Sequence, residues 1–173
     1  MGVTAVVGVL YYASWSQDDR QDKARLRRGS PTVWSEYGAN CAIGLTDLTI
    51  AAAFRALAKV SKPDTLAGLI EHLYRAISVT LRGQTDDLGG AVNSLADALS
   101  VARRKSGPLF ALALELPLSF AGRHTFLPQA SEAAESFGIG YQIYDDIVDL
   151  DEDRASKSQS NIEIAREMDL TPE

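Results

Sequence analysis

Two clusters of acidic residues share the spacing Asp-Asp-x-x-Asp. They are Asp18, Asp19 and Asp22 near the start of the chain, and Asp145, Asp146 and Asp149 near its end. In a helix, carboxylates at positions i and i+4 lie on one face, and the carboxylate at i+1 lies beside them. Such close like charges repel one another, so we expect a cation to neutralise each cluster. Oxygen ligands without nearby His or Cys favour Mg²⁺, which makes all six residues candidate metal ligands.

The surroundings of these clusters distinguish them from ordinary solvated helix ends, where acidic runs are common. Asp145 and Asp149 lie among apolar residues, and Gln142 extends the same polar stripe by one helical turn. This pattern predicts a largely buried helix, in which carboxylates need partners. Asp18 similarly ends an apolar helix rather than a polar one.

Basic residues follow the first acidic cluster and occur again at a predicted helix break. Arg27 and Arg28 precede a Gly-Ser-Pro turn, and their forked donors suit phosphate oxygens. Lys105 and Ser106 offer an ammonium group and a hydroxyl beside Gly107. Metal-binding carboxylates together with Arg and Lys in an acidic protein predict a site for a diphosphate rather than for nucleic acid.

The composition is that of a folded chain, with 173 residues of which 46% are hydrophobic and 23% charged. These values exclude disordered, collagen-like and disulfide-stapled polypeptides. The net charge of −6 disfavours binding to nucleic acid and to anionic membranes. The single cysteine, Cys41, cannot form a disulfide within the chain, which fits a reducing, cytoplasmic location. The apolar stretch over residues 3–13 is too short to span a membrane.

The spacing of apolar residues predicts an all-α fold in a single domain over residues 1–173, because no long segment alternates with period two. Breaks are expected at Gly89–Gly90 and Gly107–Pro108. The expected helices cover residues 3–23, 35–59, 65–83, 92–104, 109–121 and 129–150. A charged loop and a short segment from Asn161 follow them.

Four short motifs follow one another along most of the chain. The segment DDRQDKARLRRGSPT begins at Asp18, and YQIYDDIVD begins at Tyr141. Between them lie Gly83-Gln84-x-x-Asp87-Leu88 and Lys105-Ser106-Gly107-x-Leu109-Phe110. This ordered series resembles the trans-isoprenyl diphosphate synthases, the polyprenyl synthetase family. Ser106 replaces the Thr that this family has in the third motif, and it keeps the hydroxyl.

The resemblance implies an isoprenoid synthase-type bundle of helices around a central cavity, with both aspartate motifs at its mouth. It implies Mg²⁺ as cofactor, and isopentenyl diphosphate and an allylic diphosphate as substrates that condense to a longer trans-polyprenyl diphosphate. The catalytic roles implied fall on Asp18, Asp19, Asp22, Arg27, Lys105 and Asp145. Arg27 and Lys105 are expected to contact the allylic diphosphate and Arg28 the isopentenyl diphosphate. The other residues expected to line the site are Gln84, Asp87, Ser106 and Gln142.

The resemblance covers the central portion of such a synthase, so we expect a domain truncated at both ends. Family members carry a Gly-Lys-x-x-Arg motif before the first aspartate motif, and no segment of this chain matches it. Two other classes stay open: a non-catalytic or truncated subunit of a heteromeric synthase, and a type I terpene cyclase. A homodimer is expected, because family members pair through central helices and the Ala-rich residues 51–58 offer a close-packing surface.

Product length is predicted from the residues about one helical turn before Asp18. Bulky aromatic residues at these positions stop elongation at farnesyl in this family, whereas here the positions hold Ala13 and Ser14. Small side chains leave the cavity floor open, which predicts geranylgeranyl diphosphate or a longer product. The alternative is that Tyr11 or Tyr12 turns inward and closes the floor.

Overall fold

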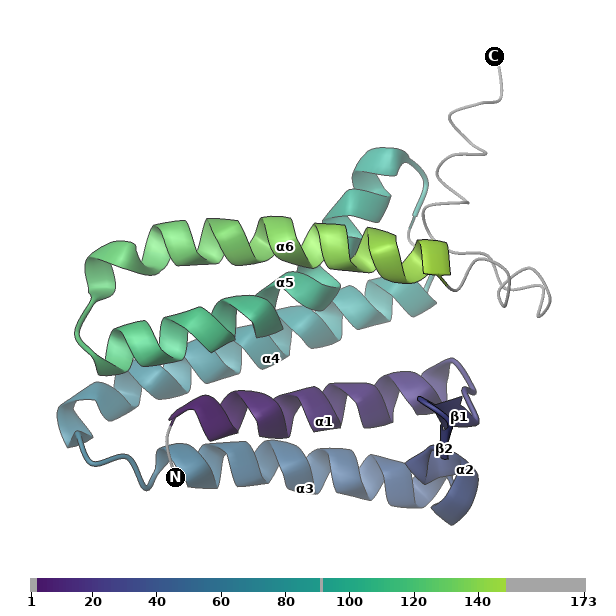
Figure 1. Cartoon of the computed structure of the whole chain (residues 1–173), viewed down its shortest axis with the longest axis horizontal. Coiled ribbons are helices and arrows are strands. Elements are labelled where there is room, and N and C mark those ends of the chain that lie inside the picture. The colour runs from purple at the N-terminus through teal and green to yellow at the C-terminus, as the bar shows by residue number, and fades with distance from the viewer. Residues whose placement is uncertain (1–2, 91, 149–173) are drawn as a thin grey trace. The chain divides into compact units, whose positions relative to one another are not determined.

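The computed structural model describes residues 3–90 and 92–148, which Figure 1 shows as long helices with one short hairpin. These residues form six α-helices, two 3₁₀ helices and two short strands. The predicted all-α fold is therefore confirmed. The chain divides into two compact units, Met1–Ile70 and Glu71–Glu173. The single domain over residues 1–173 stays a prediction.

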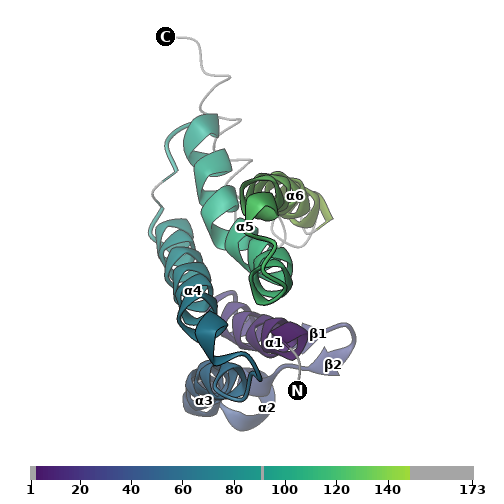
Figure 2. The same ribbon diagram turned by 90° about the vertical axis from the view of Figure 1, so that its left-hand side faces the viewer.

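In the first unit, helix α1 (Val3–Gln21) packs along helix α3 (Ala39–Leu57), and Figure 2 shows the two close to end on. Val6, Leu10 and Ala13 are buried on α1, at steps of three or four residues. This spacing places them on one face of the helix. The apolar period recognised in the sequence therefore predicts α1 correctly, apart from its last two residues.

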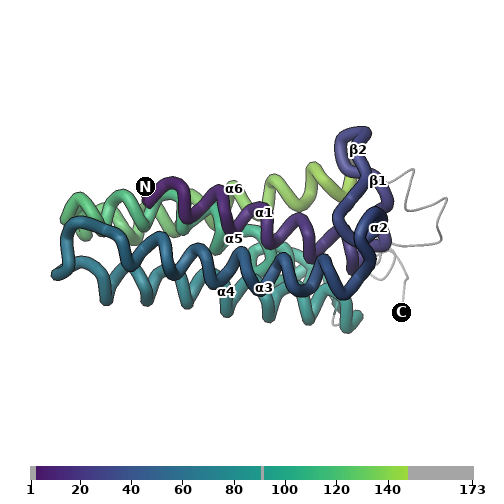
Figure 3. The backbone as a smooth tube through the Cα atoms, turned by 90° about the horizontal axis from the view of Figure 1, so that it is seen from below, coloured from purple at the N-terminus to yellow at the C-terminus, as the bar shows by residue number. Residues whose placement is uncertain are grey.

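A β-hairpin and a short helix separate α1 from α3. Strand β1 (Leu26–Arg27) pairs antiparallel with strand β2 (Ser30–Pro31). Helix α2 (Val33–Tyr37) follows the hairpin, and Figure 3 shows both at the C-terminal end of α1. Gly38 ends α2 with a φ of 89°, so the helix expected over residues 35–59 is two helices. Such a positive φ is accessible to Gly without steric cost.

Helices α4, α5 and α6 make up the described part of the second unit. Helix α4 (Leu66–Leu88) begins in the first unit after the 3₁₀ helix η1 (Pro63–Thr65) and continues into the second. Helix α5 (Leu95–Phe120) packs along α6 (Leu127–Val148), and the 3₁₀ helix η2 (His124–Phe126) lies between them in the chain.

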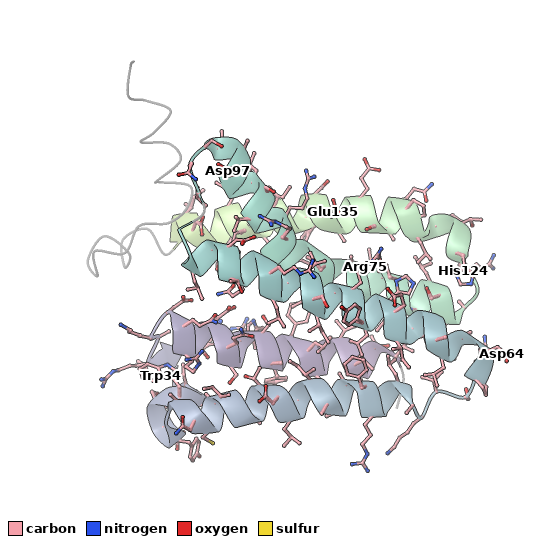
Figure 4. All side chains as sticks on the ribbon, turned by 180° about the vertical axis from the view of Figure 1, so that it is seen from behind. Trp34, Asp64, Arg75, Asp97, His124 and Glu135 are labelled. Carbon is pink, nitrogen blue, oxygen red and sulfur yellow. The ribbon has the colours of Figure 1, made fainter. Side chains whose placement is uncertain are left out.

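Helix α5 begins at a side-chain cap. Ser94 Oγ accepts a hydrogen bond from the backbone N–H of Asp97 at 3.1 Å and donates to its carboxylate at 3.0 Å. Figure 4 labels Asp97 in the first turn of this helix. The bond to Ser94 Oγ satisfies the backbone N–H of Asp97, which the first turn leaves without a helical partner. The cap explains why α5 begins three residues later than the expected helix over residues 92–104.

The break expected at Gly107–Pro108 is wrong, because α5 runs through Pro108 and also through Pro117. A proline inside a helix removes one backbone hydrogen bond and usually interrupts it. Here the buried face continues from Val101 to Leu112 and Leu116 on both sides of Pro108. Packing along α6 therefore outweighs the local signal. Helix α4 likewise continues past residue 83 to Leu88.

A buried polar cluster ties α4 to α5. Arg75 Nη2 donates to both carboxylate oxygens of Glu115, at 2.8 and 2.9 Å, and His72 Nδ1 lies 2.9 Å from Glu115 Oε2. The other ring nitrogen of His72 lies 2.9 Å from Ser119 Oγ. Figure 4 labels Arg75 on the α4 side of this cluster. Because the buried Glu115 needs these partners, the cluster fixes the register of α4 on α5.

Helix α6 is less buried than its sequence predicts. Phe137, Tyr144 and Ile147 are 60%, 66% and 61% exposed, whereas Ala134 is buried on the face toward α5. The expected loop and the segment from Asn161 lie outside the described residues. None of the helices in residues 3–90 and 92–148 has the length and apolarity needed to cross a bilayer.

Candidate active site

Residues from three of the four motifs form a polar network in the second unit, made of two hydrogen-bonded groups that the neighbouring residues Lys105 and Ser106 connect along the chain. Lys105 Nζ on α5 donates to Asp87 Oδ2 on α4 at 2.7 Å. Ser106 Oγ, also on α5, donates to Gln142 Oε1 on α6 at 3.1 Å. Gln142 Nε2 then donates to Asp146 Oδ1 at 3.0 Å. The network therefore brings together five candidate residues that the sequence places on three different helices.

A small hollow of about 10 Å³ lies among these side chains. This volume is close to that of a single water molecule. Its polar lining comes from Asp87, Lys105, Gln142 and Asp146. Its apolar lining comes from Ala98, Val101 and Ala102 on α5. An ammonium group, an amide and two carboxylates thus surround a space that apolar side chains cover on one side.

Glycines allow the three helices to approach closely enough for this network. A Cβ atom at Gly83 on α4 would lie 2.5 Å from the backbone nitrogen of Lys105. A Cβ atom at Gly138 on α6 would lie 2.7 Å from the Cα atom of Gly107 on α5. Neither crossing has room for a larger residue. This requirement gives a physical reason for the glycines of the second and third motifs.

Asp146 has the most strongly perturbed carboxyl group of the network. Burial raises the pKa of Asp146 to about 6, and the negative charges of Asp87 and Asp145 act in the same direction. The hydrogen bond from Gln142 and the charge of Lys105 oppose this rise. The raised pKa means that burial disfavours the ionised carboxylate more than Gln142 and Lys105 favour it.

The remaining candidates of the second unit occupy different environments. Gln84 is buried, directly after the Gly83 crossing. Asp145 is exposed on α6. Asp149 lies outside the described residues.

These residues fit the chemistry of a magnesium site that is completed by other ligands. Within residues 3–90 and 92–148, no three His, Cys, Asp or Glu side chains are gathered as a complete metal site. Mg²⁺ is usually held by one or two carboxylates, with water and phosphate oxygens as its other ligands. Asp146 is a candidate oxygen ligand, and burial disfavours its ionised form. The donor set therefore fits Mg²⁺ bound together with a diphosphate.

The first aspartate motif occupies the last turn of α1 and the residue after it. Asp19 is buried, and its Oδ1 accepts a hydrogen bond from Arg27 Nε at 2.7 Å. Asp18 is half-buried, and its carbonyl accepts a hydrogen bond from the backbone N–H of Asp22 at 2.8 Å. Asp22 is exposed beyond the helix end. The structure therefore joins one candidate metal ligand directly to one candidate diphosphate ligand.

The two arginines lie at the tip of the hairpin, with Arg27 as the last residue of β1 and Arg28 in the loop. Arg27 is opposite Ser30 in the ladder, so Arg28 and Gly29 form a two-residue loop. Their φ angles are 52° and 80°, which is the pattern of a type I′ turn. The backbone of this segment thus turns sharply at Arg28.

Side chains after the hairpin hold it against the end of α1. Thr32 Oγ1 and Trp34 Nε1 both donate to the carbonyl of Ala24, at 2.8 and 2.7 Å. Ser35 Oγ donates to the carbonyl of Arg25 at 2.9 Å. Figure 4 labels Trp34 in this region. Hydrogen bonds from these side chains to backbone carbonyls therefore hold the segment that carries the two neighbouring cations.

The candidate product-length residues lie on α1 of the same unit. Ala13 is buried and Ser14 is half-buried. Tyr12 is 70% exposed, and its ring centroid lies 5.7 Å from that of Trp15. Tyr11 also packs near this indole, with the ring centroids 6.3 Å apart. The Tyr12 side chain is therefore engaged with Trp15 at the surface.

Two residues of the site were missed in the sequence. Trp15 contacts both hairpin arginines, and its place four residues before Asp19 on the same helix face is a signal that could have found it. Gly138 is the second, because a glycine inside a helix is unfavourable and indicates a close contact.

Comparisons with known proteins agree with this arrangement. The chain matches the family model described as polyprenyl synthetase over residues 2–163. A nonaprenyl diphosphate synthase of Mycobacterium tuberculosis is 29% identical over 148 residues, which are 85% of this chain and 44% of that protein. The geranylgeranyl pyrophosphate synthase spyE of Aspergillus fumigatus is 31% identical over 162 residues, which are 91% of this chain and 43% of that protein. The chain thus spans less than half the length of these two relatives.

A solved structure shows the same fold. The geranyltransferase of Helicobacter pylori, complexed with magnesium and isoprenyl diphosphate, superposes with a TM-score of 0.79 at 22% identity. The match covers 86% of this chain and 52% of that protein. The expected isoprenoid synthase-type fold is therefore confirmed. Because the family model covers nearly the whole chain, the chain belongs to the polyprenyl synthetase family.

Proposed function

We propose that this chain carries the catalytic motifs of a trans-isoprenyl diphosphate synthase. The reaction is the condensation of isopentenyl diphosphate with an allylic diphosphate to give a longer polyprenyl diphosphate. One observation supports it above the others: the Lys105–Asp87 pair and the Ser106–Gln142–Asp146 group lie together across three helices, and Asp87, Lys105, Gln142 and Asp146 line one hollow. These residues come from three motifs that are distant in sequence, and an arrangement without a common role would not require them to meet.

The metal in this proposal is Mg²⁺, which supplies positive charge to the departing pyrophosphate when it is bound. Its proposed ligands are Asp18, Asp19, Asp22, Asp145, Asp146 and Asp149. In the ligand-free chain, Arg27 partly balances the charge of Asp19, Lys105 partly balances that of Asp146, and Gln142 donates a hydrogen bond to Asp146. These partners keep the buried carboxylates paired until substrate arrives.

The basic residues are proposed to bind the two diphosphates. Arg27 and Lys105 are assigned to the allylic diphosphate, and Arg28 to isopentenyl diphosphate. The Lys105 ammonium also holds Asp87, so its direction is set before a ligand binds. Fixed cations of this kind stabilise negative charge that develops as pyrophosphate leaves. The isopentenyl double bond then attacks the allylic carbon, and loss of a proton restores an allylic product.

The product is proposed to be longer than farnesyl diphosphate, most simply geranylgeranyl diphosphate. The small residues Ala13 and Ser14 on α1 support this length, and so do the names of the two relatives, which make geranylgeranyl and nonaprenyl products. Replacing both residues by Phe should shorten the product. Chromatography of the dephosphorylated alcohols measures this, and farnesol as the longest wild-type alcohol would contradict the proposal.

A homodimer is proposed as the working assembly. Helix α3 exposes Ile43 at 44%, Leu45 at 40% and Leu48 at 67%, which is an apolar surface that a second copy could cover. Sedimentation at micromolar concentration should show a dimer. Leu48→Glu should shift it toward monomer, whereas Asp47→Ala on the same exposed stretch should not.

The central experiment is a condensation assay with labelled isopentenyl diphosphate and a series of allylic diphosphates. We expect Mg²⁺-dependent formation of longer prenyl diphosphates and complete loss of turnover in excess EDTA. Turnover that is unchanged by EDTA would refute the metal assignment. A second candidate is a subunit of a heteromeric synthase, which needs a partner subunit for activity. Activity that appears only when a second synthase subunit is added would favour this candidate.

A further inference from the structure

The two arginines of the hairpin share one aromatic contact on α1. The Cζ atom of Arg27 lies 5.7 Å from the centre of the Trp15 ring, and the Cζ atom of Arg28 lies 5.3 Å from it. Both distances are within the range in which a guanidinium is attracted to an indole face. We propose that Trp15 is a positioning residue that holds both guanidinium groups ready for diphosphate. This inference rests on the proposed function, in which these arginines bind the two substrates.

The backbone of the hairpin explains why such a residue is needed. Arg28 has a φ of 52°, a left-handed conformation that is unfavourable for residues with a Cβ atom. Two neighbouring guanidinium groups also repel each other. An attractive contact that both groups share offsets these costs and selects one arrangement of the loop.

The two arginines differ in how far they depend on this contact. Arg27 has a second anchor, because its Nε donates to the buried Asp19 at 2.7 Å. Within the part of the chain that the structure describes, the Arg28 side chain has no ion pair or hydrogen bond, and its guanidinium contacts Trp15. The position of Arg28 should therefore depend more strongly on the indole.

The indole is itself held in place. The rings of Tyr11 and Tyr12 lie 6.3 and 5.7 Å from it, both inclined to its plane. Trp15 and Asp19 are four residues apart in α1, so they lie on one helix face. The indole ring of Trp15 and the carboxylate of Asp19 thus contact the hairpin from the same face of α1. Arginine side chains that are already ordered lose less conformational entropy when a diphosphate binds.

The test measures binding of inorganic pyrophosphate to the full chain in the presence of Mg²⁺, by calorimetry or equilibrium dialysis. Trp15→Leu keeps an apolar side chain of substantial size but removes the ring, and we expect affinity to fall about tenfold. Trp15→Phe keeps a ring and should stay within about threefold of wild type. Equal losses in both variants would indicate a packing role and overturn the proposal.

A double-mutant cycle separates positioning from packing. In an Arg28→Met background, Trp15→Leu should have a clearly smaller effect on pyrophosphate affinity than it has in the wild type. An undiminished effect would refute the contact as the cause. Thermal unfolding of every variant, followed by circular dichroism, checks that a lost affinity is not lost folding.

A spectroscopic measurement tests the contact without any ligand. The chain has two tryptophans and six tyrosines, so Trp34→Phe leaves Trp15 as the only tryptophan, and selective excitation of tryptophan then reports on Trp15. The Trp15 emission should change when Arg28→Met is introduced. In the protein that keeps Arg28, it should also change when pyrophosphate binds. An emission that responds to neither would overturn the inference.

Comparison with the condensation assay distinguishes the two proposals. Pyrophosphate binding that depends on Trp15 without any prenyl product would support the positioning role and refute the proposed reaction. Product formation with unaltered pyrophosphate affinity in Trp15→Leu would refute the positioning role alone. A wild-type chain that does not bind pyrophosphate would refute the role of the arginines and of Trp15 together.

Discussion

The two units position their cations by different means. In the first unit, Arg27 lies in strand β1, next to the two-residue loop of the hairpin, and its side chain is 39% exposed. In the second unit, Lys105 lies inside a long helix, and its side chain is 18% exposed beside Asp87. The arginines are held by an indole ring and a carboxylate, whereas the lysine is held by helices that meet at glycines.

This difference separates two roles of glycine in the protein. Gly29 has a φ of 80° and open space around it, so it is required for its backbone conformation. Gly83 and Gly138 are helical and lie against neighbouring backbones, so they are required for their size. Position 29 should therefore tolerate a larger side chain but not a residue that disfavours a positive φ. Positions 83 and 138 should tolerate a change in backbone preference but not a larger side chain.

The largest effect is expected from the aspartate motifs, which test whether both units serve one reaction. Asp18→Ala and Asp145→Ala should each reduce turnover by about 100-fold or more, because each removes a proposed metal ligand. Asp47→Ala on the exposed surface of α3 is the matched control and should leave the rate unchanged. Initial rates in the condensation assay measure this. An unchanged rate for Asp18→Ala or Asp145→Ala would refute the proposed metal-binding role of the aspartate motif in that unit.

The next effect concerns the helix crossings of the second unit. Gly138→Ala should destabilise the protein by roughly 1–3 kcal/mol, because its Cβ would lie 2.7 Å from the Gly107 backbone and α5 and α6 would have to separate. Gly140→Ala, two residues along the same helix with open space around it, should stabilise by up to about 1 kcal/mol. Thermal unfolding followed by circular dichroism measures both. Equal melting temperatures for the two variants would contradict the packing argument.

The same contrast shows how far the sequence predicts the structure. The motifs and the apolar period identified the helices and the residues of the second-unit network. They did not predict which residues bond to each other, because the pairing of Lys105 with Asp87 depends on how closely α4 approaches α5. The expected break at Pro108 failed for a related reason, since packing outweighed the local preference.

The contacts of the first unit were harder to predict. The basic turn was identified, but the meeting of Trp15 with Arg28 depends on a left-handed residue at the tip of the hairpin. Arginine has no preference for that conformation, so its sequence gives no local signal for it. Side-chain contacts that cross a turn therefore remain hidden until the turn type is known.

A smaller effect is expected at the hairpin glycine. Gly29→Ala should destabilise the protein by about 1 kcal/mol, because a Cβ atom disfavours a φ of 80°. Gly29→Asn adds a larger side chain but tolerates the left-handed region better, so it should cost less. Thermal unfolding measures the order of the two variants. A larger loss for Asn than for Ala would show that space, not conformation, limits this position.

A pH-dependent effect is expected at Asp146 in the second unit, whose carboxyl pKa is raised mainly by burial. The folded pKa of Asp146 is raised from 3.8 to about 6, so the folded chain binds a proton more readily than the unfolded chain between these values. Stability in EDTA should therefore fall as the pH rises from about 4 to 6. Asp146→Asn removes the charge and should melt at a higher temperature than wild type at pH 7, with the difference disappearing near pH 4. Added Mg²⁺ should stabilise the wild type and not this variant, since ligand binding favours the folded state. An Asp146→Asn variant that melts below wild type at pH 7 in EDTA would mean that Lys105 and Gln142 already stabilise the ionised carboxylate. A metal ion would then not be needed to neutralise Asp146.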